Sequence, residues 1–205
     1  MGVGSPHRLI AELVRQGRKN LTVIANDTAR PGFGIGCLIV AKAIKKLIVS
    51  HIGTNPETQR QMIAGEVEVD LCPQGSLAER IRAAGYGLGG VLTPTGIGTI
   101  VAENKRTVEI DGKLFLLELP IAADFALLAA HRADYSGNLE YALTARNFNP
   151  VMAMAATTVI AEAAEIVPTG VIPPDEVVTP GVLVDHLVGR QLVDHLMGRE
   201  KIDGR

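Results

Sequence analysis

Glycine residues at the start of the sequence could hold a negatively charged ligand. Met1, Gly2, Val3 and Gly4 lie directly ahead of a predicted helix. Glycine lets backbone N–H groups come close to an anion, and the amino end of a helix favours negative charge. The sequence therefore predicts anion binding at this turn, with an ordinary helix-entry loop as the alternative.

Amide side chains follow two of the predicted strands. Asn26 comes directly after the apolar run 21–25, and Gln74 with Gly75 comes shortly after the run 66–71. Open α/β sheets bind ligands outside the carboxyl ends of their strands, and an amide group both donates and accepts hydrogen bonds. We therefore predict ligand contacts from Asn26, Gln74 and Gly75, although plain turns with surface amides show the same pattern.

The sequence contains no residue set for covalent or metal chemistry. It has no G-x-S-x-G motif, no HExxH motif and no CxxC pair. No glutamate stands in the glycine- or serine-framed turn that would expose it as a nucleophile. The five histidines are His7, His51, His131, His186 and His195. They are far apart in the sequence, except for His186 and His195, which belong to a repeated block. We predict neither a catalytic residue nor a metal ligand in this chain.

Helices and strands alternate along the first half of the chain. The predicted helices span 6–17, 38–44, 54–63 and 76–84, and the predicted strands span 21–25, 47–50 and 66–71. Ser5 is suited to cap the first helix, and Ser76 with Glu79 resembles a capping box. This order is typical of an α/β fold with a largely parallel sheet.

The second half adds a hairpin and further strands. Asp111-Gly112 between the apolar runs 107–110 and 114–117 predicts a β-hairpin. Further strands are predicted at 125–130, 139–143, 157–161 and 182–184, with a helix at 149–156. The whole pattern predicts an α/β fold with a mostly parallel sheet and an added hairpin.

The composition argues against several classes of protein. The 205 residues include 20 basic and 22 acidic side chains, a net charge of -2, and only 3% aromatic residues. A nucleic-acid-binding domain usually has a basic excess, and a single-strand binder needs aromatic residues. No apolar run has the length of a signal peptide or of a membrane span. We therefore expect a cytoplasmic protein with no nucleic-acid or membrane partner.

The two ends of the chain are unusual. Residues 183–191 and 192–200 are nearly identical blocks, so we predict one domain over 1–190 and a tail over 191–205. The chain opens in a glycine turn with no strand before it, although such turns normally follow the first strand of an α/β sheet. We expect either a sheet that lacks this strand or a sequence without its beginning.

Five blocks of the sequence carry a resemblance to a known family. They are SHIGTNPETQRQMIAGE at 50–66, CPQGSLAERIRAAG at 72–85, LTPTGIGT at 92–99, ARNFNP at 145–150 and VTPG at 178–181. Together they resemble the alpha subunit of family I coenzyme A transferases, most closely those acting on acetate or acetoacetate. The resemblance covers nearly the whole chain.

The resemblance implies a fold and a division of labour. The fold would be the three-layer α/β/α sandwich, with a mostly parallel sheet, that CoA-transferases share with sugar-phosphate isomerases. A beta subunit would pair with this chain, usually in a heterotetramer, and would supply the nucleophilic glutamate of a ping-pong reaction. Acyl-CoA and a carboxylate would be the substrates, with no cofactor, in short-chain fatty acid or ketone-body metabolism.

The resemblance also places part of the candidate site. Met1-Gly2-Val3, Gly4 and Pro6 match the end of the family signature Gly-Gly-Phe-xxx-Gly-x-Pro, whose first three residues have no counterpart here. About 25 residues would precede Met1 in a typical relative. The alternatives are an inactive or structural paralogue, a 3-oxoadipate CoA-transferase subunit and a sugar-phosphate isomerase.

Overall fold

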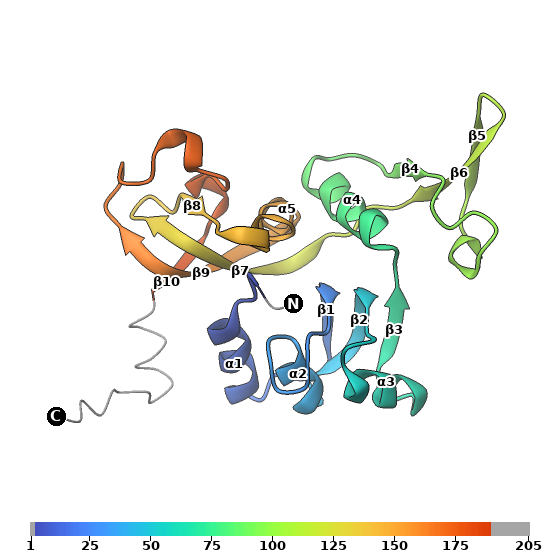
Figure 1. The fold of residues 1–205 in the computed structure, drawn as a ribbon, viewed down its shortest axis with the longest axis horizontal. Helices are drawn as coiled ribbons and strands as arrows, with labels where there is room; N and C mark the ends of the chain where they lie inside the picture. Colours follow the sequence, from blue (N-terminus) through green and yellow to red (C-terminus); the bar gives the residue numbers. More distant parts are fainter. Residues whose placement is uncertain (1–2, 190–205) are drawn as a thin grey trace.

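The computed structural model describes residues 3–189. Three small sheets and five α-helices make up this part of the chain (Figure 1). Met1, Gly2 and residues 190–205, including the predicted tail and its repeated block, lie outside the described residues.

The first sheet, sheet A, is parallel and has the order β1-β2-β3. Its strands are β1 (Leu21–Asp27), β2 (Ile44–His51) and β3 (Glu68–Leu71). The connecting helices are α2 (Gly36–Val40) and α3 (Pro56–Ile63), and α1 (His7–Arg15) precedes the sheet. The alternation of helix and strand predicted for this half is confirmed.

Both faces of sheet A are covered by helices. Ala25, Leu47 and Val49 belong to a buried cluster that includes residues of α1 and α2. Ile24 and Ile48 point to the other face, where they pack against the cluster formed around α4 (Gln74–Gly85) and α5 (Asn149–Met154). Figure 1 shows α1, α2 and α3 below the sheet and α4 and α5 above it. The predicted three-layer arrangement is therefore present.

The second sheet, sheet C, is mostly parallel and has the order β10-β9-β7-β8. β7 (Ala123–Asp134) and β9 (Ala156–Val167) are long and pair in parallel, and β8 (Leu139–Glu140) is a short antiparallel neighbour. β10 (His186–Gly189) completes the sheet. Among the described residues, sheets A and C are not joined by a hydrogen-bonded strand, so the predicted single sheet is divided.

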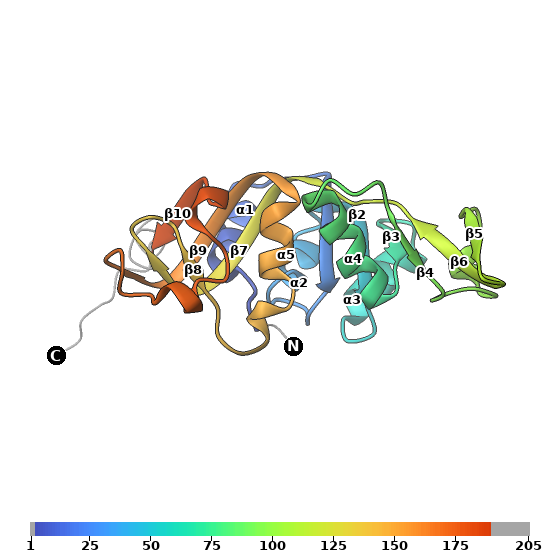
Figure 2. The ribbon, with the colours of Figure 1, turned by 90° about the horizontal axis from the view of Figure 1, so that it is seen from above.

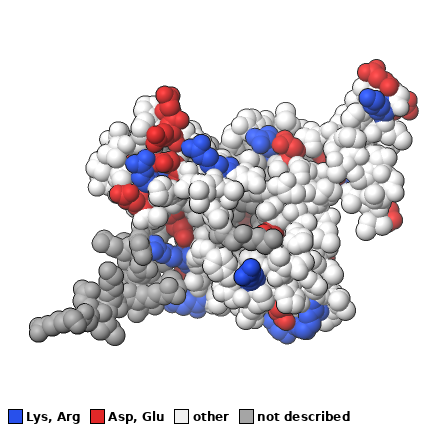
Figure 3. Space-filling view, viewed as in Figure 1, with Lys and Arg blue, Asp and Glu red and all other residues white. Residues whose placement is uncertain are grey.

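The third sheet, sheet B, contains the predicted hairpin. β5 (Thr107–Ile110) and β6 (Lys113–Glu118) pair across Asp111-Gly112, whose φ angles of 50° and 72° are both left-handed. β4 (Val91–Thr93) pairs with the other edge of β6 and lies within the glycine-rich segment 85–98. The sheet projects from the body, and its charged side chains gather at the tip (Figures 1 and 3).

Two predicted helix boundaries in the first half are wrong. The helix predicted at 38–44 ends at Val40, because Lys42 takes a left-handed φ of 49° and Ile44 already belongs to β2. The capping box at Ser76 does not form, because α4 begins at Gln74, directly after Pro73. The Ser76 hydroxyl is buried and has no hydrogen-bond partner among the described residues.

Three predicted boundaries in the second half also shift. The strand predicted at 139–143 has only two residues, because a 3-10 helix, Leu143–Arg146, starts at a left-handed Leu143. α5 ends at Met154, and Ala156 already belongs to β9. The predicted strand 182–184 falls in the 3-10 helix Gly181–Leu183, and the strand that joins the sheet is β10. None of the described helices is long and apolar enough to cross a membrane.

Candidate functional site

The carboxyl ends of β1 and β2 meet at one edge of sheet A. The Ser50 hydroxyl donates a hydrogen bond to the Asn26 carbonyl oxygen at 2.6 Å and lies 3.2 Å from the Asn26 side-chain oxygen. Asn26 and Ser50 come two residues after Ile24 and Ile48, so they lie on the same face of the sheet, toward α4 and α5. Ser50 was not predicted as a site residue, and its place opposite Asn26 follows only from the strand register.

Gln74 and Gly75 lie at the same edge. They are the first two residues of α4, which begins shortly after the end of β3, and both are exposed. Figure 2 shows the carboxyl end of β1 and the starts of α4 and α5 along one edge of the molecule. The structure therefore brings Asn26 and Gln74 to one side of the fold, as the strand-end argument predicted.

Gly4 is packed against the start of α5. Its φ is +76°, and a Cβ atom added there would lie 2.7 Å from the Cβ of Ala145 and 2.8 Å from Nδ2 of Asn149. Only glycine fits this position without a shift of its neighbours. Val3 is exposed beside it, and Met1 and Gly2 lie outside the described residues.

Asn149 holds the Gly4 turn against the body of the protein. Its Nδ2 donates to the carbonyl oxygens of Gly4 at 3.1 Å and Ala145 at 3.0 Å, and its Oδ1 accepts from the Ala129 N–H at 3.0 Å. The bonds to Gly4 and Ala129 tie this buried amide to segments that are far from it in the sequence. Sequence reasoning treated Asn149 only as the start of a helix and missed this role.

The amino end of α1 is occupied by a carboxylate of the protein itself. Oε2 of Glu162, on β9, accepts hydrogen bonds from the Arg8 N–H at 2.9 Å and the Leu9 N–H at 3.0 Å. Ser5 makes no capping hydrogen bond, and Pro6 takes the capping position. Glu162 therefore already takes two N–H groups at the start of α1, and anion binding by the turn from Met1 to Gly4 stays a prediction. Any ligand contact here must come from the turn at Gly4.

Burial raises the pKa of Glu162, although the hydrogen bonds from Leu9 and Arg8 partly oppose this. The carboxylate is therefore a structural cap between α1 and sheet C. It is not exposed in the manner of a nucleophile, and it lies on a different element from Asn26 and Gln74.

Two cavities among the described residues lie away from these groups. One is an open space of about 540 Å³ lined by Pro31, Val40, Pro56, Glu57 and Arg60. The other, of about 110 Å³, lies between the ends of α4 and α5 and the segment 178–183. Neither is lined by Gly4, Asn26 or Gln74. Residues 3–189 contain no cluster of three potential metal ligands.

Comparison with known proteins decides the family. A family model described as coenzyme A transferase matches residues 1–190. The chain belongs to the coenzyme A transferase family. This CoA-transferase chain is 56% identical over 191 residues to the acetate CoA-transferase subunit alpha of Escherichia coli K12. The aligned residues make up 93% of this chain and 87% of that protein.

A second relative agrees with this assignment, and a solved structure shares the fold. The chain is 50% identical to the alpha subunit of an acetoacetyl-CoA:acetate/butyrate CoA transferase of Clostridium acetobutylicum, over 92% of this chain and 86% of that one. It superposes on an acyl-CoA transferase of Escherichia coli O157:H7 with a TM-score of 0.82 at 24% identity, over 93% of this chain and 42% of that one. The chain is an alpha-type subunit of a CoA-transferase, and it spans less than half of that solved chain.

Proposed function

We propose that this chain works with a beta subunit to move CoA between a short-chain or 3-oxoacyl-CoA and a carboxylate such as acetate. The observation that carries the proposal is the site at the edge of sheet A. Asn26, Ser50 and Gln74 lie at or just after the ends of its strands, and acidic side chains at the end of β1 and on α3 are bound to other groups. Asp27 accepts from the Ala29 N–H at 2.8 Å, and Glu57 binds Arg60 at 2.8 Å. This arrangement supports a nucleophilic carboxylate that the partner subunit supplies.

The proposed reaction has two exchange steps on the partner's glutamate. A carboxylate oxygen of the partner subunit attacks the thioester carbonyl of acyl-CoA, and the CoA thiolate leaves, which gives a mixed anhydride. The thiolate then attacks the glutamyl carbonyl and releases the first carboxylic acid as its anion. The incoming carboxylate reverses both steps and leaves as the new acyl-CoA. Such covalent catalysis divides one difficult transfer into easier ones.

The residues of this chain would bind and orient the reacting groups. Gly4 and the residues before it would present backbone N–H groups to the acyl-CoA thioester. Gln74 and Asn26 would contact the acyl or carboxylate group at the subunit interface. Amide groups fixed at a strand end can stabilise oxygen atoms on which charge develops.

The identity of the relatives supports acetate and acetoacetyl-CoA as substrates, since the names of two similar subunits include these compounds. We place the enzyme in the cytoplasm as a heterotetramer of alpha and beta subunits, and coenzyme A acts as a substrate with no further cofactor.

The test is a co-purified complex of this chain with a beta subunit, assayed for CoA transfer from acetoacetyl-CoA to acetate. Gln74→Ala should lower kcat/KM by about 10²-fold, the cost of misplacing a reacting group by ~1 Å, while assembly stays unchanged. Gln16→Ala serves as the matched control, because Gln16 is an exposed amide at the far end of α1. A complex that assembles and transfers no CoA would favour an inactive paralogue. Full activity in Gln74→Ala would remove Gln74 from the site.

A further inference from the structure

The loop between β1 and α2 lies beside the Gly4 turn. A Cβ atom added at Gly34 would lie 3.4 Å from Oγ of Ser5, and the rings of Phe33 and His7 are 4.4 Å apart. The loop therefore flanks the segment that leads from Gly4 into α1. It begins at the carboxyl end of β1, directly after Asn26 and Asp27.

The backbone of this loop is firmly held. The carbonyl oxygen of the buried Thr28 accepts a hydrogen bond from Nδ2 of Asn55 at 2.9 Å. The Ala29 carbonyl oxygen accepts one from the Thr54 hydroxyl at 3.1 Å. Ala29 takes a left-handed φ of 52°, and its N–H donates to Asp27. A left-handed alanine is costly and persists only where its surroundings fix it.

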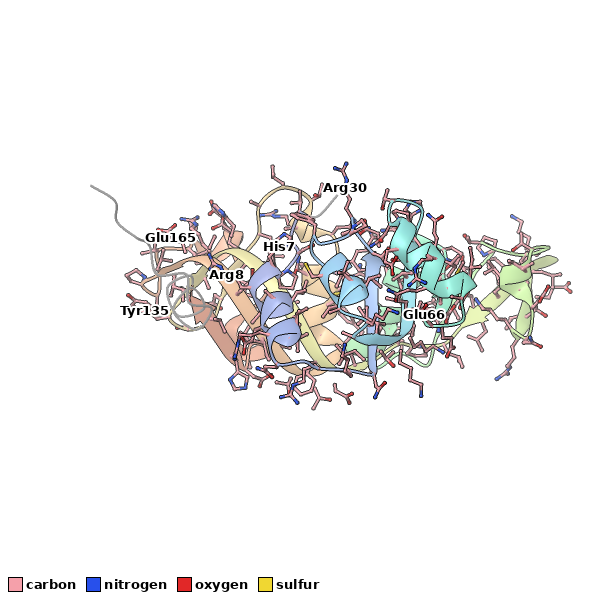
Figure 4. The ribbon with its side chains drawn as sticks, turned by 90° about the horizontal axis from the view of Figure 1, so that it is seen from below. His7, Arg8, Arg30, Glu66, Tyr135 and Glu165 are labelled. Atoms are coloured by element: carbon pink, nitrogen blue, oxygen red, sulfur yellow. The ribbon has the colours of Figure 1, made fainter. Side chains whose placement is uncertain are left out.

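The residue that these contacts position is Arg30. Its carbonyl oxygen accepts from the Phe33 N–H at 3.1 Å, and Gly36 packs so closely that an added Cβ would lie 1.9 Å from that oxygen. The side chain is exposed, and Figure 4 shows it extending from the edge of the molecule, away from the body. Within residues 3–189 the guanidinium makes no hydrogen bond or ion pair, although its backbone is fixed on both sides.

Charged and titratable side chains on the neighbouring elements have other partners. Asp27 is bound to the Ala29 N–H, and Glu57 on α3 is bound to Arg60. Glu162 caps α1, and His7 faces Phe33. An unpaired guanidinium on a fixed backbone offers the fork geometry that binds a carboxylate or a phosphate through two hydrogen bonds.

We propose that Arg30 binds an anionic oxygen group of a substrate at the rim of the site, a phosphate of acyl-CoA or the carboxylate of the acid. The inference rests on the proposed function for the identity of the substrates. Arg30 makes a ground-state binding contact and takes no part in the bond changes. Its loss therefore raises a KM and leaves kcat nearly unchanged.

The experiment compares Arg30→Gln, Arg30→Lys and wild type in the complex with the beta subunit. Arg18→Gln is the matched control, because it makes the same change of charge on an exposed side chain just before the amino end of β1. Arg30→Gln is expected to raise one KM about tenfold or more, because it removes a charge-assisted hydrogen bond to the substrate. Arg30→Lys should retain part of the binding, because it keeps the charge but loses the fork.

Assays with two different thioester substrates distinguish a phosphate of CoA from the carboxylate of the acid as the group that Arg30 binds. Acetoacetyl-pantetheine carries no phosphate, so the penalty of Arg30→Gln should vanish with it if Arg30 binds a phosphate of CoA. If Arg30 binds the acid, the KM for acetate rises with either thioester. Unchanged KM values for both substrates in an active Arg30→Gln complex would overturn the proposal.

Calorimetric titration of the complex with CoA and with acetate gives a readout that does not need turnover. If the wild-type complex transfers no CoA, the proposed function fails, and weaker binding of either compound to Arg30→Gln still supports the anion site. Equal binding by wild type and Arg30→Gln contradicts the anion site whether or not the complex is active.

Discussion

Replacing Gly4 with alanine tests how the candidate turn is held. The new Cβ would meet Ala145 at 2.7 Å and Asn149 at 2.8 Å, in a backbone with φ of +76°. A left-handed conformation costs a non-glycine residue about 1–2 kcal/mol. Overpacking adds about 1–3 kcal/mol where the neighbours must shift. We therefore expect Gly4→Ala to lower the free energy of unfolding by about 2–5 kcal/mol.

Gly17→Ala separates the two contributions. Gly17 has a similar φ of +66°, but nothing lies within 4 Å of an added Cβ. This control should therefore show only the backbone cost, about 1–2 kcal/mol.

Urea unfolding and thermal melting of both variants measure the difference. For a chain of this size, each kcal/mol corresponds to a change of about 2–4 °C in Tm. Gly4→Ala should melt well below Gly17→Ala, and only Gly4→Ala should also raise the KM for acyl-CoA in the complex. Equal losses in the two variants would refute the claim that contacts with Ala145 and Asn149 fix the turn.

Three further substitutions test the contacts around the site. Asn149→Asp removes the donor to the Gly4 and Ala145 carbonyls and puts an oxygen in its place. The free energy of unfolding, measured in urea, should therefore fall by about 2–5 kcal/mol. A loss below about 1 kcal/mol would contradict the claim that Asn149 holds the Gly4 turn. Glu162→Gln keeps an oxygen acceptor for the N–H groups of α1 but cannot ionise. Because burial raises the pKa of Glu162 above 4.5, its ionisation costs stability, and the wild type should lose stability as the pH rises through that range. The stability of Glu162→Gln relative to wild type should therefore increase between pH 4 and pH 7, and a constant difference would show that Glu162 does not titrate in this way. The buried Glu118 binds Lys105 at 2.6 Å, and Glu118→Ala leaves Lys105 without this partner. The substitution should therefore destabilise the protein by about 3–5 kcal/mol in thermal melts. A loss typical of a surface substitution would show that this pair contributes little.

Local sequence patterns were sufficient to predict most of the elements. The β-branched run in β1 and the Asp111-Gly112 turn each depend on neighbours in sequence, so they were found correctly. The end of α2 was missed because Lys42 adopts a left-handed conformation that its residue type does not favour. β10 was misplaced because Asp185 docks on Val159, more than twenty residues away in the chain.

The candidate site shows the same limit. Asn26 and Gln74 were found because both follow strands of one parallel sheet, which is a local signal combined with a topological rule. The contacts of Gly4 with Asn149 and of Arg8 with Glu162 join residues at opposite ends of the chain. No periodicity or spacing marks such contacts. The glutamate that caps α1 therefore appeared in the sequence only as one carboxylate among many.

The most direct measurement of the division of labour is the mass of each chain after reaction with substrate. The complex of this chain and its beta subunit is incubated with acetoacetyl-CoA without an acceptor acid, quenched in acid and analysed by intact-protein mass spectrometry. Our account predicts a CoA adduct on the beta subunit, formed as acetoacetate is released, and an unchanged mass for this chain. A CoA adduct on this chain, or CoA transfer by this chain purified without a partner, would contradict it.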